Sequence, residues 1–261
     1  MRLQKSLWIV TAVLLLLTCS MVSAAEPKER DWTIDGVSRQ AVVAGPDSAK
    51  QAPAPLVFVF HGHGGNMRQV ARSFRIHELW DEAIVVYMQG LNTAGQLTDP
   101  EGKRPGWQKE KGDQEDRDLK FFDEVLKSLK QDYKVDKKRV FSTGHSNGGG
   151  FTYLLWSERP DDFAAFAPSG SAALKVRNNL TPKPMLHIAG ENDPLVKYAW
   201  QTVMIDSVKK LNQCEEGKPW EEKCTQFPSK IGAPVITFVT SQGHKFPPEA
   251  PALIVKFFKQ Y

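Results

Sequence analysis

The chain has 261 residues, of which 41% are hydrophobic and 25% are charged, and its formal net charge at pH 7 is +4. These proportions are those of a globular protein, so they exclude an intrinsically disordered chain and a fibrous repeat. The basic residues form no dense run, and the composition therefore gives no support for binding a polyanion such as nucleic acid.

The first 24 residues have the pattern of a secretory signal peptide. Arg2 and Lys5 supply a positive start, residues 7–17 are apolar apart from one threonine, and small residues allow cleavage after Ala24 or Ala25. The apolar stretch is too short for a comfortable membrane span. We therefore expect a secreted or periplasmic protein with no stable membrane insertion once the signal peptide is removed.

The cysteines give two further expectations. Residues 16–19 approach a lipobox, so a lipid anchor on Cys19 is an alternative to free export, although Thr18 stands where a small Gly, Ala or Ser is favoured. Cys214 and Cys224 remain after cleavage as an even pair in an oxidising compartment. The segment between them contains no histidine to suggest a metal site. The pair therefore predicts one disulfide that closes a short loop.

The mature chain, residues 25–261, shows no linker, repeat or low-complexity tract, so we expect a single catalytic domain. Continuous apolar runs rich in β-branched residues predict buried strands, typical of a parallel sheet covered on both faces. They lie at residues 56–60, 83–87, 140–142, 185–188 and 235–239, with two more strands expected near the start at residues 32–34 and 39–43.

Amphipathic segments lie between these runs and predict helices. Their apolar residues recur at steps of three and four, in residues 119–129, 200–211 and 251–261. Strands that alternate with helices predict an α/β fold with a mostly parallel central sheet and helices on both faces. Residues 92–111 are rich in Gly, Pro and charge and predict a long surface loop that borders the functional site.

The pentapeptide Gly144-His145-Ser146-Asn147-Gly148 follows one predicted strand and opens an apolar helical run. Gly-x-Ser-x-Gly in a strand–turn–helix context predicts a nucleophile elbow. The serine occupies a strained turn, so the positions two residues away on either side must lack side chains. Ser146 is therefore the candidate nucleophile, and a flexible glycine loop is the alternative interpretation.

A serine nucleophile needs a histidine base and a carboxylate that orients it. His244 lies in a loop just after the last predicted strand, which is the expected place for the base. His187 lies inside a predicted strand and is expected to be a packed core residue. Asp193 follows that strand and is the favoured carboxylate, with Glu191 as the alternative.

Two backbone amides should stabilise the negative oxygen that forms during the reaction. One is that of Asn147, directly after the serine, and the other that of His63 in the loop His61-Gly62-His63-Gly64-Gly65. His61 is expected to hold this loop by a side-chain hydrogen bond. The pair His61 and His63 also permits a metallohydrolase, but the sequence lacks a third ligand cluster, and Asp81 and Glu82 are expected far along a helix. We therefore expect no metal.

Together these segments resemble the esterase family of polyhydroxybutyrate depolymerases and feruloyl and acetylxylan esterases, within the α/β-hydrolase superfamily. The resemblance extends over residues 55–247 and is carried by residues 60–66, 139–149, 193–196 and 243–247. It implies the α/β-hydrolase fold and cofactor-free hydrolysis of carboxylic esters through a Ser146–Asp193–His244 triad and an acyl-enzyme. Trp107 matches a Gly-Trp pair that borders the acyl site in the family, and a loop anchor is its alternative role.

The resemblance leaves the acyl and alcohol specificity open. It implies a small-molecule or oligomeric ester as the partner, and it says nothing of the oligomeric state. One rival is a serine peptidase of the prolyl oligopeptidase type, for which roughly 237 residues leave no room for a propeller domain. The other is a non-catalytic binding protein on the same fold, against which an intact triad argues.

Overall fold

The computed structural model describes residues 26–95 and 97–261. The predicted signal peptide and the lipid anchor at Cys19 therefore fall outside the described residues. Ten strands form one sheet in the order β1-β2-β4-β3-β7-β8-β9-β12-β11-β10, and β5 (Leu91–Asn92) pairs separately with β6 (Pro105–Gly106). Among these residues, no helix has the length and apolar character needed to cross a membrane.

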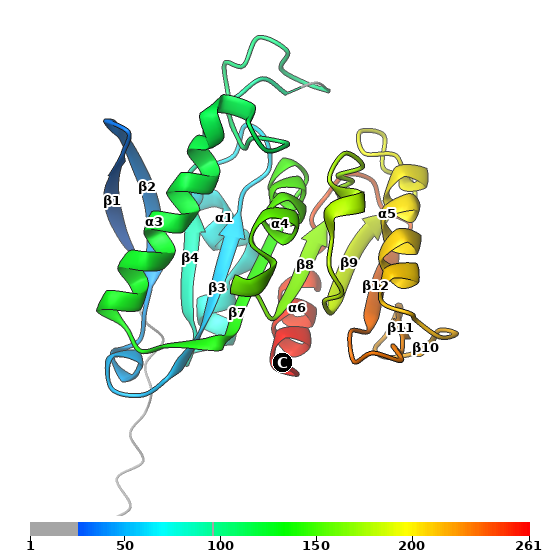
Figure 1. Cartoon of the computed structure of the whole chain (residues 1–261). Coiled ribbons are helices and arrows are strands. Elements are labelled where there is room, and N and C mark those ends of the chain that lie inside the picture. The colour runs from blue at the N-terminus through cyan, green and yellow to red at the C-terminus, as the bar shows by residue number, and fades with distance from the viewer. Residues whose placement is uncertain (1–25, 96) are drawn as a thin grey trace, which may run out of the picture.

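The middle of the sheet is parallel, as predicted (Figure 1). It consists of β4 (Ile84–Met88), β3 (Ala54–Phe60), β7 (Val135–His145), β8 (Ala165–Ser169), β9 (Met185–Gly190) and β12 (Val235–Thr240). Antiparallel strands close the two edges, namely β1 (Lys28–Ile34) and β2 (Val37–Ala44) on one side and β11 (Cys224–Phe227) and β10 (Lys218–Pro219) on the other. Each apolar run identified in the sequence lies in one of these strands, to within one residue.

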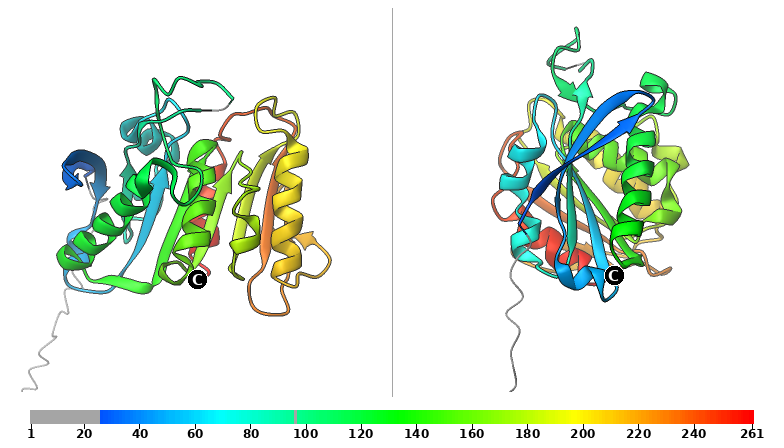
Figure 2. Two further views of the ribbon diagram at one scale, coloured as in Figure 1. Left: turned by 45° about the horizontal axis from the view of Figure 1, so that its top comes forward. Right: turned by 90° about the vertical axis from the view of Figure 1, so that its left-hand side faces the viewer.

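Helices cover both faces of the sheet, as the right-hand view of Figure 2 shows. One face carries α3 (Arg117–Asp132), α4 (Asn147–Glu158) and α5 (Tyr198–Leu211), and the other carries α1 (Met67–Phe74), α2 (Ile76–Leu79) and α6 (Ala250–Phe258). Four short 3-10 turns complete the helical segments, at Asp47–Lys50, Asp113–Asp116, Pro160–Asp162 and Arg177–Asn179. The sheet is therefore buried on both sides, which is why its central strands are apolar without alternation.

Three expectations about elements need correction. Strand β8 was not predicted, because Ala165-Phe166-Ala167-Pro168-Ser169 has weak β propensity, and its place between β7 and β9 supplies what the local sequence lacks. Helices α1 and α2 were not predicted either. Asp81 and Glu82 do not lie along a helix, because α2 ends at Leu79 and both residues sit in the following turn.

The predicted disulfide is wrong: Cys214 and Cys224 are both free thiols. Both cysteines lie in a β-hairpin that extends from Cys214 to Ser229. Cys224 lies next to its turn, and Cys214 lies opposite Ser229 at its open end. Five residues of strand at about 3.3 Å each put the two cysteines roughly 16 Å apart, whereas a disulfide needs Cα atoms within about 7 Å. The two residues also pack on opposite faces of the sheet.

Candidate active site

The turn between β7 and α4 holds Ser146 in a strained backbone conformation. Strand β7 ends at His145, α4 begins at Asn147, and Ser146 between them has a φ of 58° and a ψ of −121°. Such a conformation costs a non-glycine residue about 1–3 kcal/mol and persists only where the surroundings enforce it. The Ser146 amide donates to the Ser169 carbonyl of β8 at 2.8 Å, which helps to fix the turn.

Two glycines leave room for this turn. A Cβ on Gly144 would lie 2.5 Å from the Gly148 carbonyl oxygen, and a Cβ on Gly148 would lie 2.3 Å from the Phe60 carbonyl oxygen. Side-chain carbons do not approach a carbonyl so closely, so both positions require glycine. The Gly-x-Ser-x-Gly spacing thus has the steric cause expected from the sequence.

His244 and Asp193 reach Ser146 from two other strands of the sheet. Nε2 of His244 lies 2.7 Å from Oγ of Ser146, and Nδ1 of His244 lies 2.7 Å from Oδ2 of Asp193. Asp193 follows β9 and His244 follows β12, so the carboxyl ends of parallel strands bring the three side chains together. The carboxylate accepts the Nδ1 proton of the neutral ring, which leaves the Nε2 lone pair facing the serine hydroxyl.

Asp193 is buried and accepts hydrogen bonds on both oxygens. Its Oδ1 accepts two backbone amides of the following loop at 2.9 Å each, and its Oδ2 accepts the side-chain amide of Gln201 at 3.3 Å as well as His244. Glu191, the alternative carboxylate, is exposed at the surface. The geometry therefore places Asp193, and not Glu191, against the imidazole.

A buried chain of polar side chains continues behind Asp193. Oε1 of Gln201 lies 3.1 Å from Nε2 of His187, and Nδ1 of His187 lies 2.9 Å from the Tyr153 hydroxyl. All three side chains are fully buried, and burial lowers the pKa of His187 to about 4, so its ring is neutral. Because the Gln201 nitrogen donates to Asp193, its oxygen accepts, and His187 carries its proton on Nε2.

His187 has the buried position that the sequence predicted, but its link to Asp193 was missed. The signal available in the sequence was Gln201 itself, a glutamine among apolar residues on the inner face of a predicted helix. A polar side chain on such a face needs a hydrogen-bond partner in the core.

The loop after β3 lies directly against the nucleophile turn. A Cβ on Gly62 would be 3.5 Å from Cβ of Ser146. His61 holds this loop, because Nδ1 donates to the Gly62 carbonyl at 2.7 Å and Nε2 accepts the Gly90 amide at 3.0 Å. Burial lowers the pKa of His61 to about 4, which keeps the ring neutral, and the two hydrogen bonds to the main chain fix its tautomer.

His63 lies in the loop after β3, and Asn147 lies directly after Ser146 in the nucleophile turn. Within the described part of the chain, neither backbone N–H donates to another protein group, and both residues line the pocket that contains Ser146. Free amides at the first residue of α4 and in the adjacent loop can donate hydrogen bonds to a developing negative oxygen. This is the arrangement that the sequence predicted for the oxyanion site.

The described residues of the long loop, 92–95 and 97–111, border the site, as expected, and lie beyond the carboxyl ends of the parallel strands at the top of Figure 1. The loop is tied to the oxyanion loop by Nε2 of His63, which lies 3.1 Å from Oδ2 of Asp99. Asp99 also accepts the backbone amides of Lys103 and Arg104. The ring of His63 thus acts as a clamp on the loop, separate from its backbone amide.

The structure gives Trp107 the contacts of a loop anchor. Its indole is fully buried between Phe60 and Phe151 and donates from Nε1 to the His61 carbonyl at 2.8 Å. Its backbone amide donates to Oδ1 of Asn147 at 2.7 Å. Trp107 is not among the described residues that line the pocket, whereas the two residues after it, Gln108 and Lys109, are.

The two histidines that suggested a metal point to different partners. His61 bonds to the main chain near Gly90, whereas His63 bonds to Asp99. Across residues 26–95 and 97–261, no three His, Cys, Asp or Glu side chains are arranged to hold a metal ion.

A pocket of about 420 Å³ opens above Ser146 and His244. Apolar side chains that are partly exposed form much of its rim, namely Leu97, Leu174, Leu195 and Trp200, and two lysines, Lys109 and Lys175, also line it. These lining residues come from three separate loops and from the first turn of α5, so no local pattern in the sequence marks them as neighbours.

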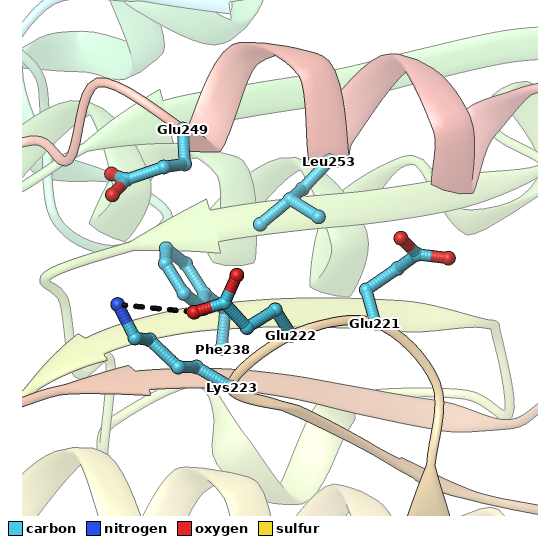
Figure 3. Close-up of a pocket in the computed structure, with 6 residues that line it drawn as sticks. All are labelled: Glu221, Glu222, Lys223, Phe238, Glu249 and Leu253. Atoms are coloured by element: carbon cyan, nitrogen blue, oxygen red, sulfur yellow. Dashed lines mark ion pairs between the residues drawn. The ribbon is translucent and has the colours of Figure 1, made fainter.

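A second, smaller hollow of about 130 Å³ lies where the β10–β11 turn faces the start of α6 (Figure 3). Its polar side chains are Glu221, Glu222, Lys223 and Glu249, and Lys223 pairs with Glu222 at 3.7 Å. Its described lining residues include neither a serine nor a histidine, whereas Ser146 and His244 line the larger pocket.

Comparison with known proteins gives a consistent picture. Residues 40–216 match the family model of the dienelactone hydrolase family. The chain is 27% identical over 227 residues to a probable feruloyl esterase C of Aspergillus flavus, covering 81% of this chain and 79% of the relative. It is 30% identical over 172 residues to feruloyl esterase D of Neurospora crassa, covering 64% of this chain and 53% of the relative.

The fold is also that of solved esterases. A ferulic acid esterase structure superposes with a TM-score of 0.65 at 13% identity, covering 90% of this chain and 97% of that chain. Likeness at this identity shows the fold alone. It confirms the α/β-hydrolase fold, and the sequence relatives confirm the resemblance to feruloyl esterases.

Proposed function

The chain belongs to the dienelactone hydrolase family and is a carboxylic ester hydrolase, and we propose that it acts through a Ser146–His244–Asp193 triad with an acyl-enzyme intermediate. The observation that carries this proposal is the pair of 2.7 Å contacts that link the three side chains in order. Backbone strain at a serine costs free energy, and a strained serine in contact with a histidine and a buried carboxylate is typical of catalytic sites.

The first half of the reaction forms the acyl-enzyme. Nε2 of His244 takes the proton from the Ser146 hydroxyl as Oγ attacks the ester carbonyl carbon. The carbonyl oxygen becomes negative and accepts hydrogen bonds from the amides of His63 and Asn147. His244 then donates its proton to the leaving alcohol, while Asp193 stabilises the imidazolium that exists between these steps.

The second half returns the enzyme to its starting state. Water takes the place of the alcohol, His244 accepts a proton from it, and the resulting hydroxide attacks the acyl carbon. The tetrahedral intermediate uses the same two amides, and its collapse releases the acid as His244 returns the proton to Ser146. All protons are conserved over the cycle, which requires no cofactor.

We further propose esters of aromatic acids, of the feruloyl type, as substrates. The support is the name of the curated relatives and the rim of Leu97, Leu174, Leu195 and Trp200, which offers an apolar surface next to Ser146. A planar aromatic acid buries its ring well against such side chains. Secretion through cleavage near Ala24 remains part of the proposal, as does a single catalytic domain over residues 25–261.

Turnover of methyl ferulate and of methyl hexanoate by the purified protein tests this function. Wild-type protein should hydrolyse both and favour the aromatic ester in kcat/KM, and Ser146→Ala should lower kcat by about 10⁴-fold or more. Asp193→Asn should cost about 10²–10⁴-fold, whereas the matched variant Glu191→Gln should not. Full activity in Ser146→Ala would overturn the mechanism, and a preference for the aliphatic ester would overturn the substrate.

A further inference from the structure

The two segments that carry the proposed oxyanion donors are joined through a third segment. His63 belongs to the loop of residues 61–65 after β3, and Asn147 is the first residue of α4. Among the described residues, no hydrogen bond joins this loop directly to Asn147. Two donors must both reach one oxygen, so the oxyanion site depends on what fixes their separation.

Residues 105–107 bind the loop from one side. The Gly64 amide donates to the Pro105 carbonyl at 2.7 Å, and Nε1 of Trp107 donates to the His61 carbonyl at 2.8 Å. The Trp107 side chain is fully buried, which shields the second hydrogen bond from water. The short segment is therefore tied at both of its ends to the main chain of the loop that carries the first donor.

The side chain of Asn147 binds the same segment from the other side. Its Oδ1 accepts the backbone amide of Trp107 at 2.7 Å, and its Nδ2 donates to the backbone carbonyl of Trp107 at 3.2 Å. A carboxamide carries an acceptor and a donor side by side, so it can pair with both main-chain groups of one residue. Neither alanine nor leucine at this position could form the pair.

Gly106 lies in the space between the two donor residues. A Cβ on Gly106 would be 2.7 Å from Nδ1 of His63 and 2.9 Å from Oδ1 of Asn147, closer than side-chain carbons approach such atoms. The His63 ring is also held on its other nitrogen by Asp99. A side chain at Gly106 would therefore push apart the two residues whose amides have to converge.

We propose that Gly106 and the side chain of Asn147 are positioning residues of the oxyanion site, which hold residues 105–107 as a spacer between the amides of His63 and Asn147. The inference rests on the proposed function, because these amides are the donors proposed there. In this role neither group touches the substrate. Both act on the chemical step, because donors that are fixed in place before the reaction stabilise the negative oxygen most.

A pair of esters that differ in one atom tests the proposal. One is 4-nitrophenyl hexanoate, and the other is its thiono analogue, in which sulfur replaces the carbonyl oxygen. Sulfur is larger than oxygen and accepts hydrogen bonds more weakly, so an intact oxyanion site favours the oxygen ester. Partial unfolding or a displaced triad lowers both rates alike. The ratio of kcat/KM for the oxygen ester over the thiono ester therefore reports on the two amides.

Asn147→Ala removes both hydrogen bonds to Trp107 and keeps the Asn147 backbone amide. Loss of a whole oxyanion donor costs about 10²–10³ in kcat, and a displaced donor should cost less, so we expect the ratio to fall about tenfold. Gly106→Ala should lower the ratio in the same direction. The matched control is Asn212→Ala, because this buried amide donates to the Lys183 carbonyl at 2.8 Å and lies outside the pocket lining. Its ratio should equal that of wild type.

The outcomes separate this inference from the proposed function. An unchanged ratio in Asn147→Ala, or an equal fall in Asn212→Ala, overturns the positioning role and leaves the esterase mechanism standing. Failure of wild-type protein to hydrolyse the oxygen ester overturns the proposed function itself. If Asn147→Ala does not fold, Asn147→Leu decides in the same way, because leucine has a similar shape and forms neither hydrogen bond.

Discussion

Gln201 connects helix α5 to Asp193, and behind it lie His187 and Tyr153. The carboxylate depends on this donor for part of its orientation, because its other oxygen is held by the loop that follows it. Gln201 itself lies outside the pocket lining among the described residues. Its removal should therefore affect the chemical step more than substrate binding.

Replacing Gln201 by leucine should lower kcat about tenfold, as loss of one hydrogen bond to a charged group implies, and should change KM by less than about twofold. Thr202→Ala, on the next position of α5, is the control, since its hydroxyl donates only to the helix carbonyl of Tyr198. Steady-state kinetics on one neutral ester measure both. An unchanged kcat in Gln201→Leu, or a loss confined to KM, would show that the buried chain does not position Asp193.

His63 can separate two roles within one residue, because its ring binds Asp99 while its backbone amide has no partner within the described residues. His63→Ala keeps the amide and should cost about tenfold in kcat, through a loosened loop. His244→Ala removes the base and should cost about 10⁴-fold or more. Parallel assays compare the two variants; equal losses would mean that the His63 ring takes part in the chemistry.

At the scale of elements, the hairpin of β10 and β11 keeps Cys214 and Cys224 apart, and burial raises the pKa of both thiols, that of Cys224 to about 11. We expect both to alkylate as free thiols in folded protein that has not been reduced, with Cys214 reacting first because it is less buried. Peptide mapping by mass spectrometry identifies them. Detection of two peptides joined through Cys214 and Cys224 would support the disulfide and contradict the separation of the two cysteines in the hairpin.

Elements whose sequences carry their own signal could be predicted. Strands β3 and β12 are continuous apolar runs. The nucleophile turn leaves no room for a side chain at Gly144 or Gly148, and both glycines are visible in the sequence. Strand β8 could not be predicted, since its alanines and Pro168 become a strand only between two neighbours. The prediction of a disulfide was wrong for a related reason. The number of residues between two cysteines does not tell how far apart a hairpin places them in space.

The site shows the same division. Ser146, Asp193 and His244 each follow a predicted strand, so chain order alone indicates that they could meet. The role of Gln201 and the position of Lys109 depend on which helix face and which loop pack beside that meeting point. These are long-range contacts, and residues that are far apart in the sequence determine them together.

At the scale of the whole molecule, three histidines whose pKa values are strongly lowered tie stability to pH. Burial lowers the pKa of His61, His145 and His187 from 6.5 to about 4 in each case. Between these values the unfolded chain binds protons that the native protein does not, so stability is complete above about pH 6.5 and falls as the pH drops toward 4.

Denaturant unfolding followed from about pH 7 to pH 5 should show this decline, with uptake of up to about three protons by the unfolded state. His187→Gln should make the decline shallower by about one proton, whereas replacement of an exposed lysine should leave its slope unchanged. A free energy of unfolding that stays constant over this range would mean that the three rings are not buried in neutral form.

The central claim is that Ser146 is an activated nucleophile, and labelling by a fluorophosphonate probe tests it most directly. Folded wild-type protein should gain one phosphonyl group, mapped by mass spectrometry to the peptide that contains Ser146, and unfolded protein should gain none. Ser146→Ala should remain unlabelled, and His244→Ala should label far more slowly because the hydroxyl loses its base. Labelling at another residue, or undiminished labelling of Ser146→Ala, would contradict the account.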